Sequence, residues 1–90
     1  MHLTLRYFAS LREALGPGGP LDWTPAPDAS AAPATVAGLR DHLLALSPAH
    51  AHALARGRAV RVAVDQVLAD EATALHDGAE VAFFPPVTGG

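Results

Sequence analysis

The residues whose chemistry stands out lie at the carboxyl end of the sequence, Phe83-Phe84-Pro85-Pro86-Val87-Thr88-Gly89-Gly90. Two prolines after an apolar segment favour an extended polyproline conformation, so residues 85–90 could project about 20 Å at roughly 3.3 Å each. Because glycine lacks a Cβ, Gly89 and Gly90 can pass through a narrow channel and leave the last carbonyl open to attack. The pattern predicts an acyl carrier that works through the carboxyl group of Gly90.

A terminal carboxyl group has a pKa of about 3.3 to 3.7, so it is ionised and inert at neutral pH until another protein converts it to an acyl derivative. The alternative is that the two glycines are incidental, because chain ends often carry small residues simply as disordered segments. In that case the chain is a binding module.

The other groups of potentially reactive residues give weaker evidence for a functional site. His50 and His52 are two residues apart and would point to different sides of a helix, so with His42 they are interpreted as solvated histidines rather than a metal site. The glycines of segment 16–20 lack the Lys-Ser/Thr step of a phosphate-binding loop. The adjacent carboxylates at positions 70–71 are typical of a solvated face.

Length, charge and composition exclude several further classes of protein. Ninety residues make about one domain. Six basic residues, all arginine, against nine acidic ones give a net charge of −3, so nucleic acid is not the expected partner. There is no cysteine for a disulfide or a thiolate nucleophile. The opening residues contain no uninterrupted apolar stretch and no run of 18 apolar residues occurs, so we expect a cytoplasmic protein without a membrane partner.

The first half of the sequence predicts two strands around a short helix. Alternation of apolar and polar residues predicts a strand over 2–9. Ser10 and Glu13 have the spacing of a capping box, which predicts a helix that begins there and ends at Gly16. Residues 16–33 are rich in proline and glycine and predict a hairpin return with a long loop, in which only residues 21–24 could pair as a short edge strand.

The second half predicts the main helix and three strands. Thr35 is the expected N-cap of a helix whose buried stripe is Val36, Leu39, Leu43 and Leu46. Pro48 ends this helix or restarts it, and residues 50–56 continue as a loose helical turn. Strands are predicted over residues 60–64, 67–68 and 80–84. The order of elements predicts an α+β domain over residues 1–84, with a mixed sheet of four or five strands on one main helix, followed by a tail over 85–90.

Three segments of the sequence resemble one known family. The ending GAEVAFFPPVTGG, the opening LRYFASLREALG and the stretch RVAVDQ are similar to the small, sulfur-carrying subunits of molybdopterin synthase. The similarity covers nearly the whole chain except residues 16–33. It implies a ubiquitin-like β-grasp fold with a flexible Gly-Gly tail.

The resemblance also implies a cycle. A ubiquitin-activating-type enzyme uses ATP and magnesium to adenylate Gly90, and a sulfurtransferase system then replaces the adenylate with sulfur to give a thiocarboxylate. The tail enters the large subunit of molybdopterin synthase and donates sulfur to cyclic pyranopterin monophosphate. The small subunit binds no cofactor tightly and contributes no acid or base of its own.

Site residues follow from the same resemblance. Gly89 and Gly90 match the terminal pair of the family, and the segment threaded into the partners matches Phe84, Pro85, Pro86, Val87 and Thr88. Phe8, Leu68 and Phe83 match apolar positions of the docking face. Because residues alternate between the two faces of a strand, Phe83 and Phe84 cannot both face inward, so one of them is expected at an interface.

Two further functions use the same tail chemistry. The chain could carry sulfur for thiamin synthesis, a cysteine pathway or tRNA thiolation. It could also be a ubiquitin-like modifier that forms isopeptide bonds with other proteins, although without lysine it could not build chains on itself.

Overall fold

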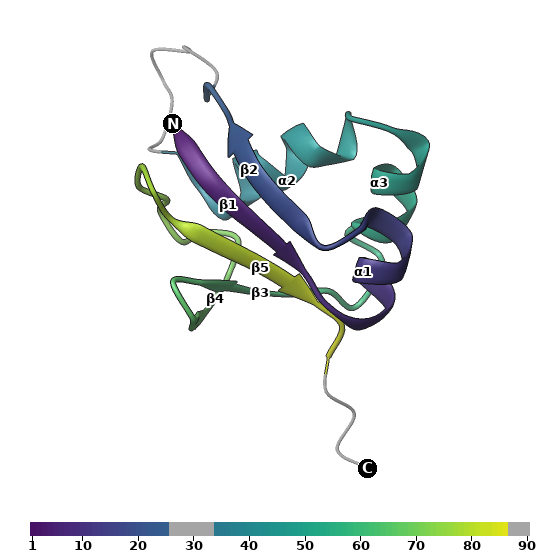
Figure 1. Ribbon diagram of the computed structural model, residues 1–90. Helices are drawn as coiled ribbons and strands as arrows, with labels where there is room; N and C mark the ends of the chain where they lie inside the picture. The colour runs from purple at the N-terminus through teal and green to yellow at the C-terminus, as the bar shows by residue number, and fades with distance from the viewer. Residues whose placement is uncertain (26–33, 87–90) are drawn as a thin grey trace.

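The computed structural model describes residues 1–25 and 34–86. Five strands form one mixed sheet with the order β2-β1-β5-β3-β4 (Figure 1). β1 and β5 are parallel neighbours at its centre, and the other pairs are antiparallel. This arrangement confirms the predicted α+β fold. The elements in chain order are β1 (His2–Tyr7), α1 (Ala9–Leu15), β2 (Gly18–Asp22), α2 (Val36–Leu44), α3 (Pro48–Ala53), β3 (Arg61–Val64), β4 (Val67–Ala69) and β5 (Glu80–Phe84).

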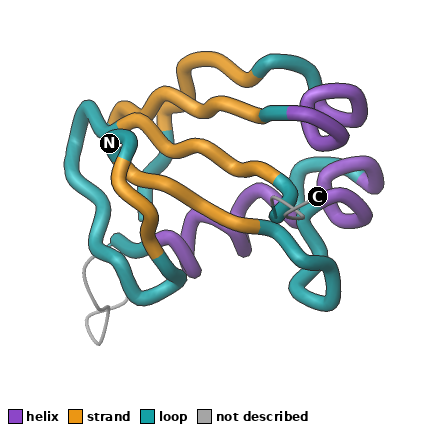
Figure 2. The backbone as a smooth tube through the Cα atoms, turned by 90° about the horizontal axis from the view of Figure 1, so that it is seen from below, coloured by secondary structure: helices purple, strands orange, loops and turns teal. Residues whose placement is uncertain are grey.

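The core lies between the sheet and the helices, which cover one face only (Figure 2). Alternate residues of the strands point into it, as the period of two predicts. Each helix adds apolar side chains to the same cluster. The largest fully buried side chains are Phe83, Leu39, Leu43, Leu54, Val36 and Val81. The opposite face of the sheet carries no helix among the described residues.

The start of α1 differs from the prediction. β1 ends at Tyr7 rather than at residue 9, and the helix begins at Ala9 with Phe8 as its N-cap. Phe8 has the extended backbone that an N-cap requires, and its carbonyl oxygen accepts a hydrogen bond from the Leu11 amide at 3.1 Å. The predicted capping box is therefore wrong: Ser10 lies inside the first turn, and no side chain caps this helix.

The return of the chain after α1 forms a longer strand than the sequence predicted. β2 spans Gly18–Asp22, not residues 21–24, and pairs antiparallel with β1 from His2↔Asp22 to Arg6↔Gly18. Pro20 lies within it. Because β2 is at the edge of the sheet, a residue without an amide hydrogen is tolerated there.

The main helix agrees with its prediction except at its end. The Thr35 hydroxyl accepts a hydrogen bond from the Gly38 amide at 3.3 Å, which confirms the N-cap. α2 ends at Leu44, so Leu46 lies beyond the buried stripe and is 49% exposed, contrary to expectation. Ser47 caps α3, and the helix restarts at Pro48. Proline is favourable at the first helical position because its missing amide hydrogen would be unpaired there.

Candidate functional site

The base of the tail follows directly from the centre of the sheet. β5 lies between β1 and β3, and Pro85 comes immediately after its last residue (Figure 1). The Phe8 amide donates a hydrogen bond to the Phe83 carbonyl oxygen at 3.2 Å, so the pairing with the first strand continues almost to the tail. Pro85 and Pro86 are half-buried. The predicted residues Val87, Thr88, Gly89 and Gly90 lie outside the described residues.

The structure distinguishes the two phenylalanines that precede the tail. Phe83 is 1% exposed and belongs to the core, whereas Phe84 is half-buried on the helix-free face. The expected alternation is thus observed, with Phe84 as the outward residue. Because the side chain of Phe83 is enclosed, it supports the strand from inside and is not part of the surface that a partner could contact.

The helix-free face carries an apolar strip over β5, β3 and β4, bordered by Arg6 of β1. The pairing registers place Arg6, Ala82, Ala63 and Leu68 side by side, because Arg6 pairs with Ala82, Ala82 with Ala63, and Ala63 with Leu68. Leu68 is 66% exposed at the edge of the sheet. Phe84 lies in the next row towards the tail, opposite Arg61. We call the apolar strip the set Phe8, Ala63, Leu68, Ala82 and Phe84.

Phe8, which lies between β1 and α1, belongs to the same strip. Phe8 is 41% exposed, and its ring centroid lies 5.7 Å from the Arg6 guanidinium, a cation–π contact that holds the two side chains together. The predicted docking residues Phe8 and Leu68 therefore lie on the same face as Phe84. The sequence did not identify Ala63 and Ala82, because only the register between strands shows that they connect the exposed residues.

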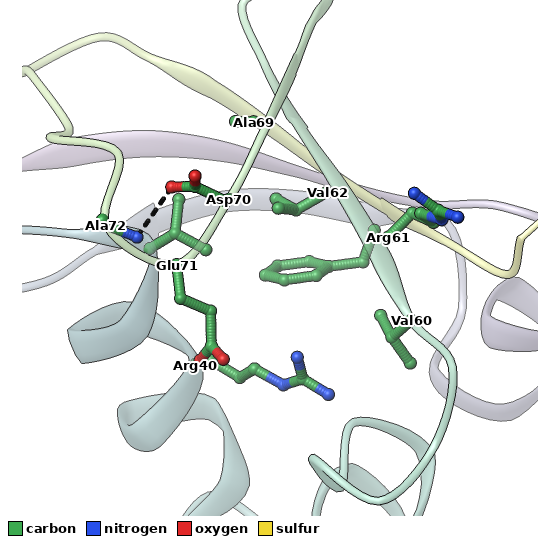
Figure 3. A pocket seen from close by; sticks show the side chains of 10 residues that line it. Arg40, Val60, Arg61, Val62, Ala69, Asp70, Glu71 and Ala72 are labelled. Carbon is green, nitrogen blue, oxygen red and sulfur yellow. Dashed lines mark hydrogen bonds between the residues drawn. The ribbon is translucent and has the colours of Figure 1, made fainter.

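A cavity of about 570 Å³ lies on the opposite side, between α2, β3 and the segment that follows β4 (Figure 3). Three of its polar side chains, those of Arg40, Asp70 and Glu71, are already hydrogen-bonded within the fold. The Arg40 Nε donates to the Leu54 carbonyl oxygen at 2.7 Å and its Nη2 to that of Ala55 at 3.0 Å. Glu71 accepts a hydrogen bond from Arg56 at 2.7 Å. Arg40 thus satisfies carbonyl groups at the end of α3, which is a structural role.

The histidines do not form a ligand cluster. His50 Nδ1 lies 2.7 Å from the Ser47 hydroxyl, and His52 Nε2 accepts a hydrogen bond from Arg58 at 3.2 Å. Within residues 1–25 and 34–86, no group of three or more His, Cys, Asp or Glu side chains could hold a metal ion. In the same part of the chain, no helix has the length and apolar character to cross a membrane.

A five-stranded mixed sheet with helices on one face, and a terminal segment leaving its central strand, defines the ubiquitin-like β-grasp class. A crystal structure of SAMP1 from Haloferax volcanii has this fold, with a TM-score of 0.70 and 27% identity over 100% of both chains. A second crystal structure, of the small archaeal modifier protein 1 of this organism, has a TM-score of 0.67 and 27% identity over 96% of this chain and 98% of that chain.

The sequence identifies the family within this class. The profile of the ThiS family matches residues 5–90, so the chain belongs to that family. The molybdopterin synthase sulfur carrier subunit of Escherichia coli is 44% identical over 93% of this chain and 94% of its own length. The subunit of the same name from Haemophilus influenzae is 38% identical over 98% of this chain and 99% of its own length.

Proposed function

We propose that this protein carries sulfur as a thiocarboxylate on Gly90 and donates it to cyclic pyranopterin monophosphate in the large subunit of molybdopterin synthase. The observation that carries the proposal is membership of the ThiS family through residue 90, with relatives at 44% and 38% identity that are named sulfur carrier subunits of that enzyme. The fold supports it, because a central strand leads straight into residues 85–90.

The chemistry requires activation by other proteins. An adenylating enzyme with ATP and magnesium joins the Gly90 carboxylate to the α-phosphorus of ATP, and pyrophosphate leaves. The mixed anhydride is an electrophile, and a sulfurtransferase system supplies the sulfur that displaces AMP. The resulting thiocarboxylate is a good nucleophile at neutral pH. In this proposal the protein works in the cytoplasm and holds no cofactor.

The apolar strip supports the docking step. A partner that covers Leu68, Phe84 and Phe8 would remove exposed apolar surface from water while the tail, which starts one residue after Phe84, enters its active site. Such burial contributes roughly 25 cal/mol per Å². The same face can serve the adenylating enzyme and the large subunit in turn, because both must receive the same tail.

The test is the intact mass of the chain after coexpression with its adenylating enzyme and a sulfur donor. We expect a gain that corresponds to one sulfur atom replacing one oxygen atom. A variant without Gly90 should fold, because no residue of the core follows Phe83, and should show no gain. An unchanged mass with active partners would contradict the proposal.

The acceptor is tested separately with the thiocarboxylated chain. Addition to the large subunit and cyclic pyranopterin monophosphate should yield molybdopterin. No product there, together with sulfur transfer in a thiamin, cysteine or tRNA thiolation assay, would assign the chain to one of those pathways instead.

Likeness to the small archaeal modifier protein 1 over almost the full length favours protein modification as a second candidate. Incubation of the activated chain with lysine-containing proteins distinguishes the two functions. Conjugates of increased mass would support a modifier, whereas a sulfur carrier leaves such proteins unchanged.

A further inference from the structure

The two edges of the sheet differ in the backbone groups that they present to solvent. Successive residues of a strand direct their N–H and C=O groups to opposite sides, so the pairing shows which residues point outwards. In β2, the Trp23 amide donates a hydrogen bond to the Met1 carbonyl oxygen at 2.9 Å, which makes Pro20, three residues earlier, point away from β1. Because proline has no N–H, the middle of this edge offers only a carbonyl group to another strand.

The opposite edge, formed by β4, is open (Figure 1). The Asp65 amide donates a hydrogen bond to the Glu80 carbonyl oxygen of β5 at 2.8 Å. By alternation, Val64 directs its backbone groups to β4, where it pairs with Val67. The next residue of β4, Leu68, therefore directs both its N–H and its C=O away from the sheet, and this three-residue strand contains no proline or charged residue that would protect it.

The side chains of β4 are exposed on both faces of the sheet. Leu68 is 66% exposed and belongs to the apolar strip of the helix-free face. Val67 is 67% exposed and points to the other face, because it pairs with Val64, whose side chain lies in the core. A protein that lies flat on the helix-free face covers Leu68 and leaves Val67 in water. A strand added beside β4 covers both side chains and pairs with the Leu68 backbone.

The size of this edge determines which kind of partner fits it. Two copies of the chain joined only through β4 would bury three residues each, far less than a stable interface of about 1,200 to 2,000 Å² requires. The edge must therefore be part of a larger contact. The surface that is continuous with it among the described residues is the apolar strip, which shares Leu68 and leads to Phe84 at the base of the tail.

We propose that the large subunit that accepts the tail also adds an extended strand to the edge of β4. This inference rests on the proposed function and adds a backbone contact to the docking on the apolar strip. The added strand exchanges hydrogen bonds with the N–H and C=O of Leu68, and its alternate apolar side chains lie against Leu68 on one face and Val67 on the other. Such pairing fixes the register between the two proteins, and with it the point at which the tail enters the partner.

Two substitutions at one position test the backbone contact. Leu68→Ala and Leu68→Pro both remove the leucine side chain, but only the proline also removes the outward N–H. Pro20 occupies an outward position at the β2 edge, so this sheet accepts such a proline. We expect Leu68→Pro to bind the large subunit about fivefold or more weakly than Leu68→Ala in titration calorimetry. Equal affinities of the two variants, both folded by circular dichroism, would overturn the inference.

Val67 provides a second test that leaves the backbone of β4 intact. Val67→Lys and Val67→Glu place opposite charges where the added strand lies, and both should weaken binding about tenfold or more because apolar burial is lost. Leu46→Lys is the matched control, because Leu46 is also exposed but lies beyond the end of α2, and it should bind like the unchanged protein. Unchanged affinity of both Val67 variants, or weakening by only one sign of charge, would overturn the inference.

The outcomes separate this inference from the proposed function. Absence of sulfur transfer by the unchanged chain contradicts the proposed function. Normal transfer, with affinities that do not respond to these substitutions, contradicts only the added strand. Sedimentation of the chain alone tests another occupant: a dimer that Leu68→Pro abolishes and Leu68→Ala retains would assign the edge to a second copy and overturn the inference. If the unchanged chain does not bind the large subunit, both are overturned.

Discussion

The ring of Tyr7 stacks on that of Phe83, with 6.1 Å between the ring centroids and 26° between the planes. The two residues are in-register partners at the ends of β1 and β5, one residue before the strands give way to α1 and to the tail. Both are at least 96% buried. This aromatic pair anchors the ends of β1 and β5 to the core, so the strand that leads into the tail is packed up to the residue before Phe84.

Tyr7→Phe should leave the free energy of unfolding unchanged or raise it by up to about 1 kcal/mol, because the variant keeps the ring and removes a buried hydroxyl. That hydroxyl has no hydrogen-bond partner among the described residues, and burial raises the pKa of Tyr7. Urea unfolding measures the change. Tyr7→Ala, which also removes the ring, should lower stability by roughly 3 to 5 kcal/mol. A loss of more than about 1 kcal/mol in Tyr7→Phe would mean that the hydroxyl has a stabilising partner.

Gly18→Ala should be one of the most damaging small substitutions in the sheet. A Cβ there would lie 2.2 Å from the Leu5 carbonyl oxygen, and the residue has φ +96. Gly16 has a similar φ of +84, but a Cβ at this position would meet no atom within 4 Å. Its substitution therefore measures the cost of the backbone conformation without a steric clash. We expect Gly16→Ala to cost about 1 kcal/mol and Gly18→Ala at least about 2 kcal/mol more, measured by thermal unfolding. Equal losses would show that β2 moves away without cost.

Leu68→Asp should weaken capture of the large subunit at least tenfold, about 1.4 kcal/mol, while the fold remains intact. Leu46→Asp is the matched control, because Leu46 is also exposed, 49% against 66%, but lies beyond the end of α2, away from the apolar strip. Titration calorimetry measures both. If the two variants weakened binding equally, the helix-free face would not be the docking surface.

His76→Asn should lower stability mainly in mildly acidic solution. The Asp65 carboxylate lies 2.7 Å from His76 Nε2 and raises the pKa of that histidine, while hydrogen bonds from the Glu80 amide and His76 lower the pKa of Asp65. The raised pKa of His76 stabilises the fold fully below about pH 6.5, its unfolded value, and this contribution is lost as pH rises through the folded value. The lowered pKa of Asp65 stabilises above its unfolded value and is lost as pH falls through the folded value.

The difference in unfolding free energy between the His76→Asn variant and the unchanged protein should therefore be largest at about pH 5 to 6 and should shrink towards pH 8. Urea unfolding at several pH values measures it. A difference that grows as the pH rises would contradict this assignment of the pair.

Local sequence patterns were sufficient for most of the elements. The alternation in β1, β3 and β5 and the spacing of three and four in α2 depend only on which residues are apolar, so both could be predicted without tertiary contacts. The resemblance pointed to the tail and to Phe8 and Leu68 for a similar reason, since those residues match the family position by position. The capping box failed because a sharp turn at Ala9, with φ +52, makes Phe8 the N-cap instead.

The sequence by itself determined the types of element, the main helix and the composition of the tail, because these follow from spacing along the chain. Only the tertiary structure decided that Phe83 faces the core and Phe84 the helix-free face, and that Ala63 and Ala82 connect Leu68 to the base of the tail. Each of these depends on how strands pair and on which face the helices cover. These features bring together residues that are far apart in the chain. A shift of one strand by one residue would move its inward-facing side chains to the opposite face of the sheet.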